Sequence, residues 1–173
     1  AVGEWLSATV VSAYLKQVGL ENKLQDVRDI IRTDNTYRNA KVDWEVTAEN
    51  VNRYVKPYFS ESTNKLMITP GFVGSTSENF NSTLGREGSD YTGGIFANLV
   101  DAESLTIWKD VPGMLNADPK WFEETEKLNN ISYHEAVELA YYGATVIHPK
   151  TIKPLQNKNI PLLVKSFVNP DEE

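Results

Sequence analysis

The residues best suited to chemistry lie in TPGFVGSTSENFNSTLGREGSDYTGG, where an apolar run is followed by a polar excursion and a glycine-rich turn. The two glycines of GREGSD allow a ligand to approach the backbone closely, and Ser89 or Asp90 can cap a helix that begins there. The first N–H groups of such a helix attract an anion, and the guanidinium of Arg86 matches a carboxylate or a phosphate. A plain turn with a solvated arginine has the same pattern, so this segment alone leaves both interpretations open.

A second candidate segment is IWKDVPGMLNADPK, in which a strand-like run is followed by turn-forming residues. Ligands of open α/β sheets bind beyond the carboxyl ends of the strands, so Lys109 and Asp110 stand where the ribose or phosphates of a nucleotide would lie. The Pro-Gly and Asp-Pro pairs of the segment are equally typical of ordinary turns. A purely structural turn therefore stays the alternative here.

Other polar residues favour structural roles. His134 and His148 are too few and too isolated for a catalytic triad or a zinc site. His148 precedes Pro149, and we interpret it as a hydrogen-bonding residue at the head of a helix. Glu4 lies in the first turn of a predicted helix, where the helix dipole favours a carboxylate in any case.

Apolar periodicity predicts the helices that position these residues. Intervals of three and four residues predict a helix from Glu4 to Val18, with Gly19 as its C-cap. A second helix is predicted from Thr47, as N-cap, to about Val55, with Pro57 just beyond its end. Further helices are predicted over 89–100, over 132–142 and after Pro149.

Short aliphatic runs predict the strands. LMITP, SLTIW and PLLVKS are continuous and apolar, which is typical of parallel strands buried on both faces. The polar stretch 74–83 is predicted to be a loop or an irregular hairpin. Because strands and helices alternate, the fold class is predicted to be α/β with an open, mainly parallel sheet.

Composition excludes several classes of function. The 173 residues suffice for one domain, and 17 basic against 24 acidic residues give a formal charge of −7, which disfavours nucleic-acid binding. The absence of cysteine excludes a disulfide framework, a thiolate zinc site and a thiol nucleophile. No run approaches the roughly 20 apolar residues that span a bilayer, and no signal-peptide pattern is present. We expect a cytoplasmic protein with a small-molecule partner.

Four separated motifs resemble the amino-acid kinase family and, within it, the aspartokinases. They are GEWLSA, TPGFVGS with TLGREGSDYT, WKDVPG with ADPK, and GATVIHPKT. The resemblance covers essentially the whole chain and implies a three-layer sandwich of the carbamate kinase-like type. It implies one partial domain, truncated at its amino-terminal side, with substrate-side elements over about 1–75 and a nucleotide-binding part over about 76–173. The resemblance implies that the family's KFGG motif would lie upstream and that its regulatory ACT domains would lie outside these 173 residues.

The resemblance also implies roles for single residues. Glu4 would receive the substrate ammonium, Arg86 would bind a substrate carboxylate, and Ser89 would line the same pocket. Asp90 would organise the cationic groups around the transferring phosphate, and it is a predicted catalytic residue together with Lys109. The predicted nucleotide-binding residues are Lys109, Asp110, Met114, Leu115, Lys120 and Thr145.

Several positions depart from the family pattern. Leu115 stands where many relatives have a tyrosine, and Lys120 where many have an arginine. Thr145 replaces the lysine that faces the nucleotide phosphates, whereas Lys109 replaces the more usual threonine before Asp110. We hypothesise that the positive charge has moved between two loops that border one pocket.

The function implied by the resemblance is ATP-dependent phosphorylation of the side-chain carboxylate of L-aspartate to 4-phospho-L-aspartate. This reaction is the first step toward lysine, threonine and methionine, with ATP and Mg²⁺ required and a homodimer expected for the full-length protein. The isolated chain is expected to be inactive. One alternative is another family member acting on N-acetylglutamate, glutamate or a nucleoside monophosphate, although Glu4 favours a free ammonium. A non-catalytic binding or dimerisation module is the other.

Overall fold

The structure is a computed structural model that describes residues 2–61, 63, 65–111, 113–117, 121–122, 124–141 and 146–170. The chain forms two compact units, Ala1–Thr92 and Gly93–Glu173, which are described one at a time. The predicted division near residue 75 separates a substrate-binding part from a nucleotide-binding part, whereas these units are defined by their internal contacts. That division stays a prediction.

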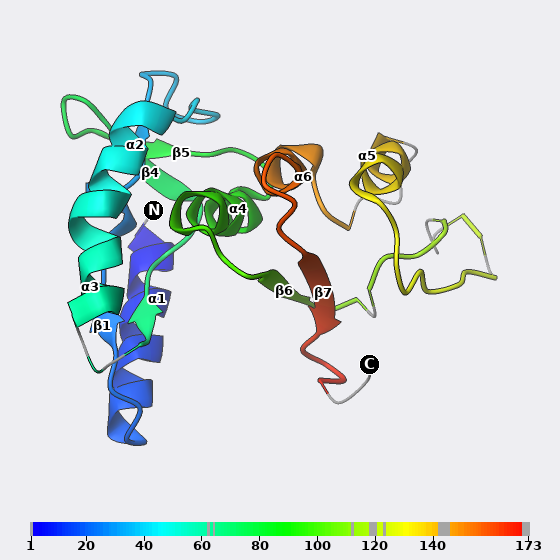
Figure 1. Ribbon diagram of the computed structural model, residues 1–173, viewed down its shortest axis with the longest axis horizontal. Coiled ribbons are helices and arrows are strands. Elements are labelled where there is room, and N and C mark those ends of the chain that lie inside the picture. The colour runs from blue at the N-terminus through cyan, green and yellow to red at the C-terminus, as the bar shows by residue number, and fades with distance from the viewer. Residues whose placement is uncertain are drawn as a thin grey trace. The chain divides into compact units, whose positions relative to one another are not determined.

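Unit 1 opens with the helix α1 (Val2–Gln17), which confirms the first predicted helix. Gly19 has a φ of 86°, the left-handed conformation that ends helices and that glycine adopts without strain. Ala8 and Ser12 are buried on one side of α1, which lies beside β1 and β3 (Figure 1). Much of the rest of the helix surface is exposed and apolar, with Val2, Leu6, Val10, Val11 and Tyr14 accessible to solvent.

Two small sheets follow in unit 1. β1 (Lys23–Leu24) pairs in parallel with β3 (Met67–Ile68). The other sheet has the order β2–β4–β5, in which β2 (Arg32–Thr33) is parallel to β4 (Val73–Thr76) and β5 (Asn81–Thr83) is antiparallel to β4. The polar stretch predicted as a loop or hairpin is therefore a hairpin, and its first strand is fully buried.

Hydrogen bonds explain how so polar a strand is buried. The Arg32 guanidinium donates through Nη1 to Ser75 Oγ at 2.6 Å and to the carbonyl oxygen of Thr76 at 2.9 Å. Thr33 Oγ1 and Ser82 Oγ share a hydrogen bond of 2.7 Å. Because buried polar groups are tolerated when they are paired, this network replaces the apolar contacts that a buried strand normally makes.

A short 3-10 helix (Val27–Asp29) precedes β2 and carries an ion pair. Asp26 accepts the backbone N–H of Arg28 at 3.0 Å and both the Nε and the Nη2 of its guanidinium. Burial raises the pKa of Asp26, but the hydrogen bonds from Arg28 outweigh it and hold that pKa below its usual value. The guanidinium also lies 6.0 Å from the ring centre of Trp5 on α1.

The second predicted helix is wrong at both ends. The helix α2 (Trp44–Asn50) begins three residues before Thr47, because Asp43 accepts the Val46 N–H at 3.1 Å and is the N-cap. Thr47 is buried within the helix instead. A π-turn (Val51–Val55) then leads directly into α3 (Lys56–Glu61), so Pro57 lies inside a helix rather than beyond one. Pro57 has no backbone N–H to donate to the turn before it, so this continuous helical run lacks one backbone hydrogen bond there.

The helix α4 (Gly88–Val100) begins in unit 1 and confirms the prediction for 89–100. Unit 2 contains β6 (Leu105–Lys109) and β7 (Leu162–Ser166), which pair in parallel, with α5 (Tyr133–Tyr141) and α6 (Pro149–Gln156) as its helices. Figure 1 shows α5 and α6 side by side. Three of the four strand pairings within the described ranges are parallel, which confirms the α/β class and the mainly parallel sheets.

The strands of unit 2 are less buried than predicted. In β6 only Ile107 is buried, and in β7 only Ser166. Ile107 belongs to a core with Met114, Ala136, Ile147 and Ile152. Burial on both faces was therefore wrong for these two strands, because their core contacts lie on one side.

The start of α6 follows the sequence prediction, and one glycine of unit 2 allows two helices to pack closely. His148 Nδ1 accepts the Lys150 N–H at 3.1 Å and caps α6, the structural role expected of it. A Cβ on Gly94 would lie 3.0 Å from the Thr151 carbonyl oxygen, so this glycine serves close packing of α4 against α6. No helix in the described part of the chain has the length and apolar character needed to cross a membrane.

Candidate functional site

A cavity of about 520 Å³ lies in unit 1 where α4 begins. Its lining comes from four separate parts of the chain: Glu4 on α1, Arg38 in the loop before α2, Phe72, and residues 85–89. We call it the unit 1 cavity. The structure thus places Glu4, Arg86 and Ser89, the three predicted substrate-binding residues, along one cavity.

Close backbone packing shapes this cavity. A Cβ on Gly71 would lie 2.9 Å from Ser89 Cα. Only glycine therefore allows the segment between β3 and β4 to approach the start of α4 so closely. Thr92 Oγ1 accepts the Phe72 N–H at 3.0 Å and donates to the Gly88 carbonyl oxygen at 2.8 Å. These contacts fix the TPGF turn against the first turn of α4.

The electrostatics of the unit 1 cavity are mixed. Two basic residues, Arg38 and Arg86, and two acidic residues, Glu4 and Glu87, are among those that line it. The N-terminus of α4 adds a partial positive charge. Such a lining can bind a ligand that carries both an ammonium and carboxylates.

The start of α4 differs from the prediction. Neither Ser89 nor Asp90 precedes the helix, because α4 begins at Gly88 and both lie in its first turn. Glu87 is the residue before the helix, and its carbonyl oxygen accepts the Tyr91 N–H at 3.1 Å. Asp90 is half-buried and is not among the residues that line the cavity.

Sequence reasoning missed Arg38, Phe72 and Glu87 as cavity residues. Arg38 is far from the other arginine in the sequence, and no spacing rule connects the two. Glu87 lies inside the GREGSD motif, but a glutamate in a turn is usually solvated, so its charge alone did not indicate a binding residue. Phe72 follows Gly71 in TPGF and has a φ of 71°, which only the structure reveals.

Two of the predicted nucleotide residues, Lys109 and Asp110, lie at the end of β6 in unit 2. Lys109 is the last residue of the strand, and its Nζ donates to the Val146 carbonyl oxygen at 2.6 Å. Its own carbonyl oxygen accepts the Phe167 N–H at 2.9 Å, which continues the pairing of β6 with β7. Asp110 follows and is exposed.

A second cavity of about 610 Å³, the unit 2 cavity, is lined by Gly113, Met114, residues 127–131 and residues 161–166. Met114 lines it and is also part of the core of unit 2. Leu115 forms an antiparallel bridge with Lys127 and does not line the cavity, and neither do Lys109 and Asp110. Lys120 and Thr145 lie outside the described residues.

Known proteins resemble the chain in sequence. Residues 1–166 match the sequence model of the amino acid kinase family. The bifunctional aspartokinase/homoserine dehydrogenase 2 of Arabidopsis thaliana, a chloroplastic protein, is 40% identical over 167 residues, which are 96% of this chain and 18% of the plant protein. The lysine-sensitive aspartokinase 3 of Escherichia coli is 34% identical over 168 residues, which are 97% of this chain and 37% of the bacterial one.

Solved structures resemble the fold. The crystal structure of E. coli aspartokinase III in complex with aspartate and ADP matches with a TM-score of 0.91 and 34% identity, over 98% of this chain and 37% of that one. Clostridium acetobutylicum aspartate kinase matches with a TM-score of 0.77 and 29% identity, over 99% of this chain and 35% of that one. These matches confirm the predicted amino-acid kinase fold.

The chain spans less than two fifths of the length of these relatives. The prediction that it is the carboxy-terminal part of the catalytic domain stays a prediction. The family itself is shown by the match over residues 1–166, because that match covers nearly the whole chain. The chain belongs to the amino-acid kinase family.

Proposed function

We propose that the protein containing this chain phosphorylates the side-chain carboxylate of L-aspartate with ATP. The observation that carries this proposal is the unit 1 cavity, which is lined by two arginines and two glutamates, residue types that can bind an amino acid with two carboxylates. A carboxylate oxygen of the substrate would attack the γ-phosphorus of ATP. The bond from that phosphorus to the β–γ bridging oxygen would break, giving 4-phospho-L-aspartate and ADP.

The unit 1 cavity would hold the amino acid. Glu4 would accept hydrogen bonds from the substrate ammonium, and Arg86 would bind a carboxylate in the two-pronged manner that suits a guanidinium. Ser89, in the first turn of α4, would add a hydroxyl and its backbone N–H. An N-acetylated substrate has no ammonium for Glu4, so this lining favours a free amino acid over N-acetylglutamate.

Residues of unit 2 would hold the nucleotide. The ammonium of Lys109 is held on the carbonyl of Val146, the residue after Thr145, and this contact supports the hypothesis that Lys109 supplies the charge absent at position 145. Asp110 is exposed beyond the strand end, where a ribose hydroxyl can reach it. We propose Met114, Leu115 and Lys120 as further contacts along this loop, and Thr145 as a contact from the separate GATVIHPKT segment.

Mg²⁺ would enter as its complex with the ATP phosphates, a mode that needs only one or two protein carboxylates. Within the described ranges there is no group of three or more histidine, cysteine or acidic side chains that could hold a metal ion. Asp90 fits the role of organising the cations around the transferring phosphate, because it offers one carboxylate in the first turn of α4. Magnesium would neutralise charge on the phosphates.

No protein nucleophile is needed for this chemistry. Phosphoryl transfer spreads negative charge over the equatorial oxygens, so catalysis depends on positioning and on cationic groups. Lys109, Arg86 and the N-terminus of α4 are groups of this kind. The solved complex of E. coli aspartokinase III with aspartate and ADP supports the choice of ligands.

Calorimetric titration of the chain tests the proposal. Mg-ADP is titrated first, followed by L-aspartate, L-glutamate and N-acetyl-L-glutamate. Saturable nucleotide binding together with a preference for L-aspartate is the expected result. A preference for N-acetyl-L-glutamate would instead favour another activity within the family, and amino-acid binding without nucleotide binding would favour a non-catalytic binding module.

The role of Lys109 has its own test. Lys109→Ala is expected to weaken Mg-ADP binding about tenfold, because a charge-assisted contact to phosphate is lost. Thr145→Ala is the matched control, and we expect it to change the affinity little. Equal and small effects of the two substitutions would refute the transfer of charge from position 145 to position 109.

We further propose that the full-length protein is a homodimer. The exposed apolar side of α1 supports a contact with another surface, because exposed apolar patches mark interaction sites. Sedimentation of the full-length protein is the direct measurement, and a single monomeric species at high concentration would contradict the proposal.

A further inference from the structure

Glu87 has an unusual backbone conformation. Its φ of 53° lies in the left-handed region, which glycine, asparagine and aspartate enter far more readily than a residue with a long side chain. It stands at the entrance to α4, between Arg86 and Gly88, and it lines the unit 1 cavity. Strained backbone of this kind persists where the surrounding structure enforces it, and it clusters at ligand sites.

The side chain of Glu87 is equally unusual. Its Oε2 is buried and accepts no hydrogen bond within the described part of the chain. A carboxylate just before a helix normally accepts N–H groups of the first turn. Because this buried oxygen does not, capping does not account for the residue. The residue as a whole is only partly buried and lines the cavity, so rotation of its side chain would bring the carboxylate to a ligand there.

The surroundings indicate which donor is missing. The carboxylate shares its cavity with the carboxylate of Glu4, and both arginines of the cavity can bind carboxylates of a ligand. Two carboxylates and two guanidiniums match a ligand with one ammonium and two carboxyl groups. A cation is the group that a buried carboxylate lacks, and the ammonium is the cation of such a ligand.

We propose that Glu87 is a specificity-determining residue that binds the substrate ammonium together with Glu4. This inference rests on the proposed function, because it deepens the assignment of the unit 1 cavity to an amino dicarboxylic acid. With two carboxylates bound to it, the free ammonium would be the group of the ligand that contributes most to recognition. Dicarboxylic acids without an amino group would therefore be rejected by two unpaired carboxylates rather than one.

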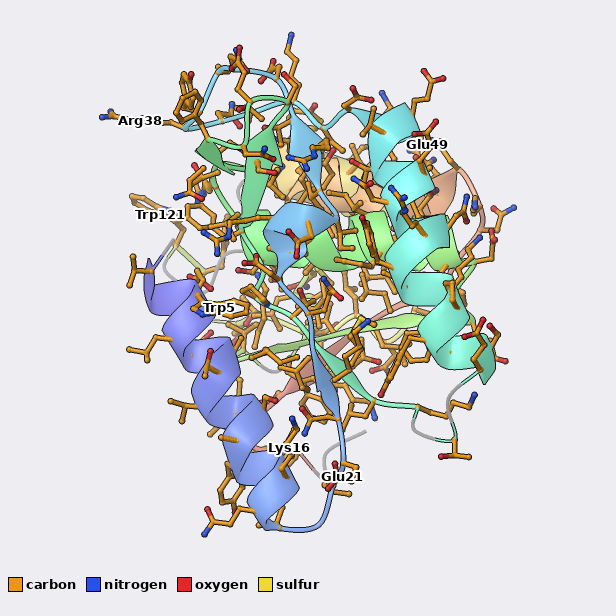
Figure 2. The ribbon with its side chains drawn as sticks, turned by 90° about the vertical axis from the view of Figure 1, so that its left-hand side faces the viewer. Trp5, Lys16, Glu21, Arg38, Glu49 and Trp121 are labelled. Carbon is orange, nitrogen blue, oxygen red and sulfur yellow. The ribbon has the colours of Figure 1, made fainter. Side chains whose placement is uncertain are left out.

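The test compares two ligands and three proteins by calorimetry. L-aspartate carries the ammonium, and succinate has the same two carboxylates without it. Glu87→Gln removes the charge but keeps the size of the side chain and the backbone conformation that Glu87 has. Glu49→Gln, on the exposed side of α2 and well away from Arg38, is the matched control (Figure 2).

We expect Glu87→Gln to raise the dissociation constant of L-aspartate at least tenfold while that of succinate stays the same or falls. The control should change neither. An equal change for both ligands, or no change for L-aspartate, would overturn the role of Glu87 and leave the proposed function standing. No aspartate binding by the unaltered chain would instead overturn the assignment of the amino acid to the unit 1 cavity. Should Glu87→Gln fail to fold, Glu87→Asn repeats the test, because asparagine tolerates the left-handed conformation.

Discussion

Replacing Gly71 by alanine is a direct test of the contact that shapes the unit 1 cavity. The new Cβ would lie 2.9 Å from Ser89 Cα and 3.0 Å from Ser89 Cβ. Carbon atoms pack favourably at about 3.5–4.0 Å, so the two segments would have to separate by roughly half an ångström or more. Ser89 lies in a helix, and it cannot yield by a side-chain rotation alone.

The expected loss of stability follows from this overlap. Overpacking of this kind costs about 1–3 kcal/mol, and the stiffer unfolded chain of an alanine variant offsets about 0.4–1 kcal/mol of it. We expect the free energy of unfolding to fall by about 1–2 kcal/mol. For a chain of this size that corresponds to a melting temperature lower by about 2–8 °C.

Urea unfolding followed by circular dichroism measures the change, and Gly3→Ala is the control. A Cβ on Gly3 would meet nothing within 4 Å, and this glycine lies in α1, so alanine there should stabilise the chain by up to about 1 kcal/mol. The Gly71 variant should also bind L-aspartate more weakly, because Ser89 lines the cavity. If both variants were as stable as the unaltered chain, the close approach of Gly71 to Ser89 would be refuted.

Two further substitutions test other contacts of unit 1. Thr92→Val keeps the shape of the side chain but leaves the partly buried Phe72 N–H without its acceptor, so we expect urea unfolding to show a loss of about 1 kcal/mol. An unchanged midpoint would contradict the hydrogen bond. The pKa of Asp26 is held low by Arg28, so its ion pair stabilises the fold above the unfolded-state pKa and is lost as the pH falls through the lower folded-state pKa. Asp26→Asn should therefore be less stable than the unaltered chain at neutral pH, and the difference in stability should shrink below about pH 4. Thermal unfolding across that pH range measures it, and a constant difference would count against the ion pair.

Local signals in the sequence were sufficient for several elements. The helices around residues 4–18 and 89–100 were predictable because periodic apolar residues and a nearby cap act within a few positions. The caps at Gly19 and His148 were predictable for the same reason. In the second helix Asp43 and Thr47 are both suitable N-cap residues. Their preferences for that position are too similar for the sequence alone to decide between them.

Long-range contacts limited the rest. β4 is buried although it is polar, because Arg32 satisfies it from a distant strand, and apolar patterning cannot detect such a partner. Glu4, Arg86 and Ser89 were predicted from the family motifs, and the structure brings them to one cavity. Arg38 carries no motif, and the unusual state of Glu87 exists only in three dimensions.

The π-turn between α2 and α3 has a consequence for comparing sequences of this family. In it the Lys56 N–H reaches back five residues to the Val51 carbonyl oxygen, so the helix holds one residue more than regular α-helical geometry allows. Removing that residue would leave both flanking helices intact. Sequence alignments of relatives should therefore place a one-residue gap between Asn50 and Lys56, inside a helix, where insertions and deletions are ordinarily penalised most.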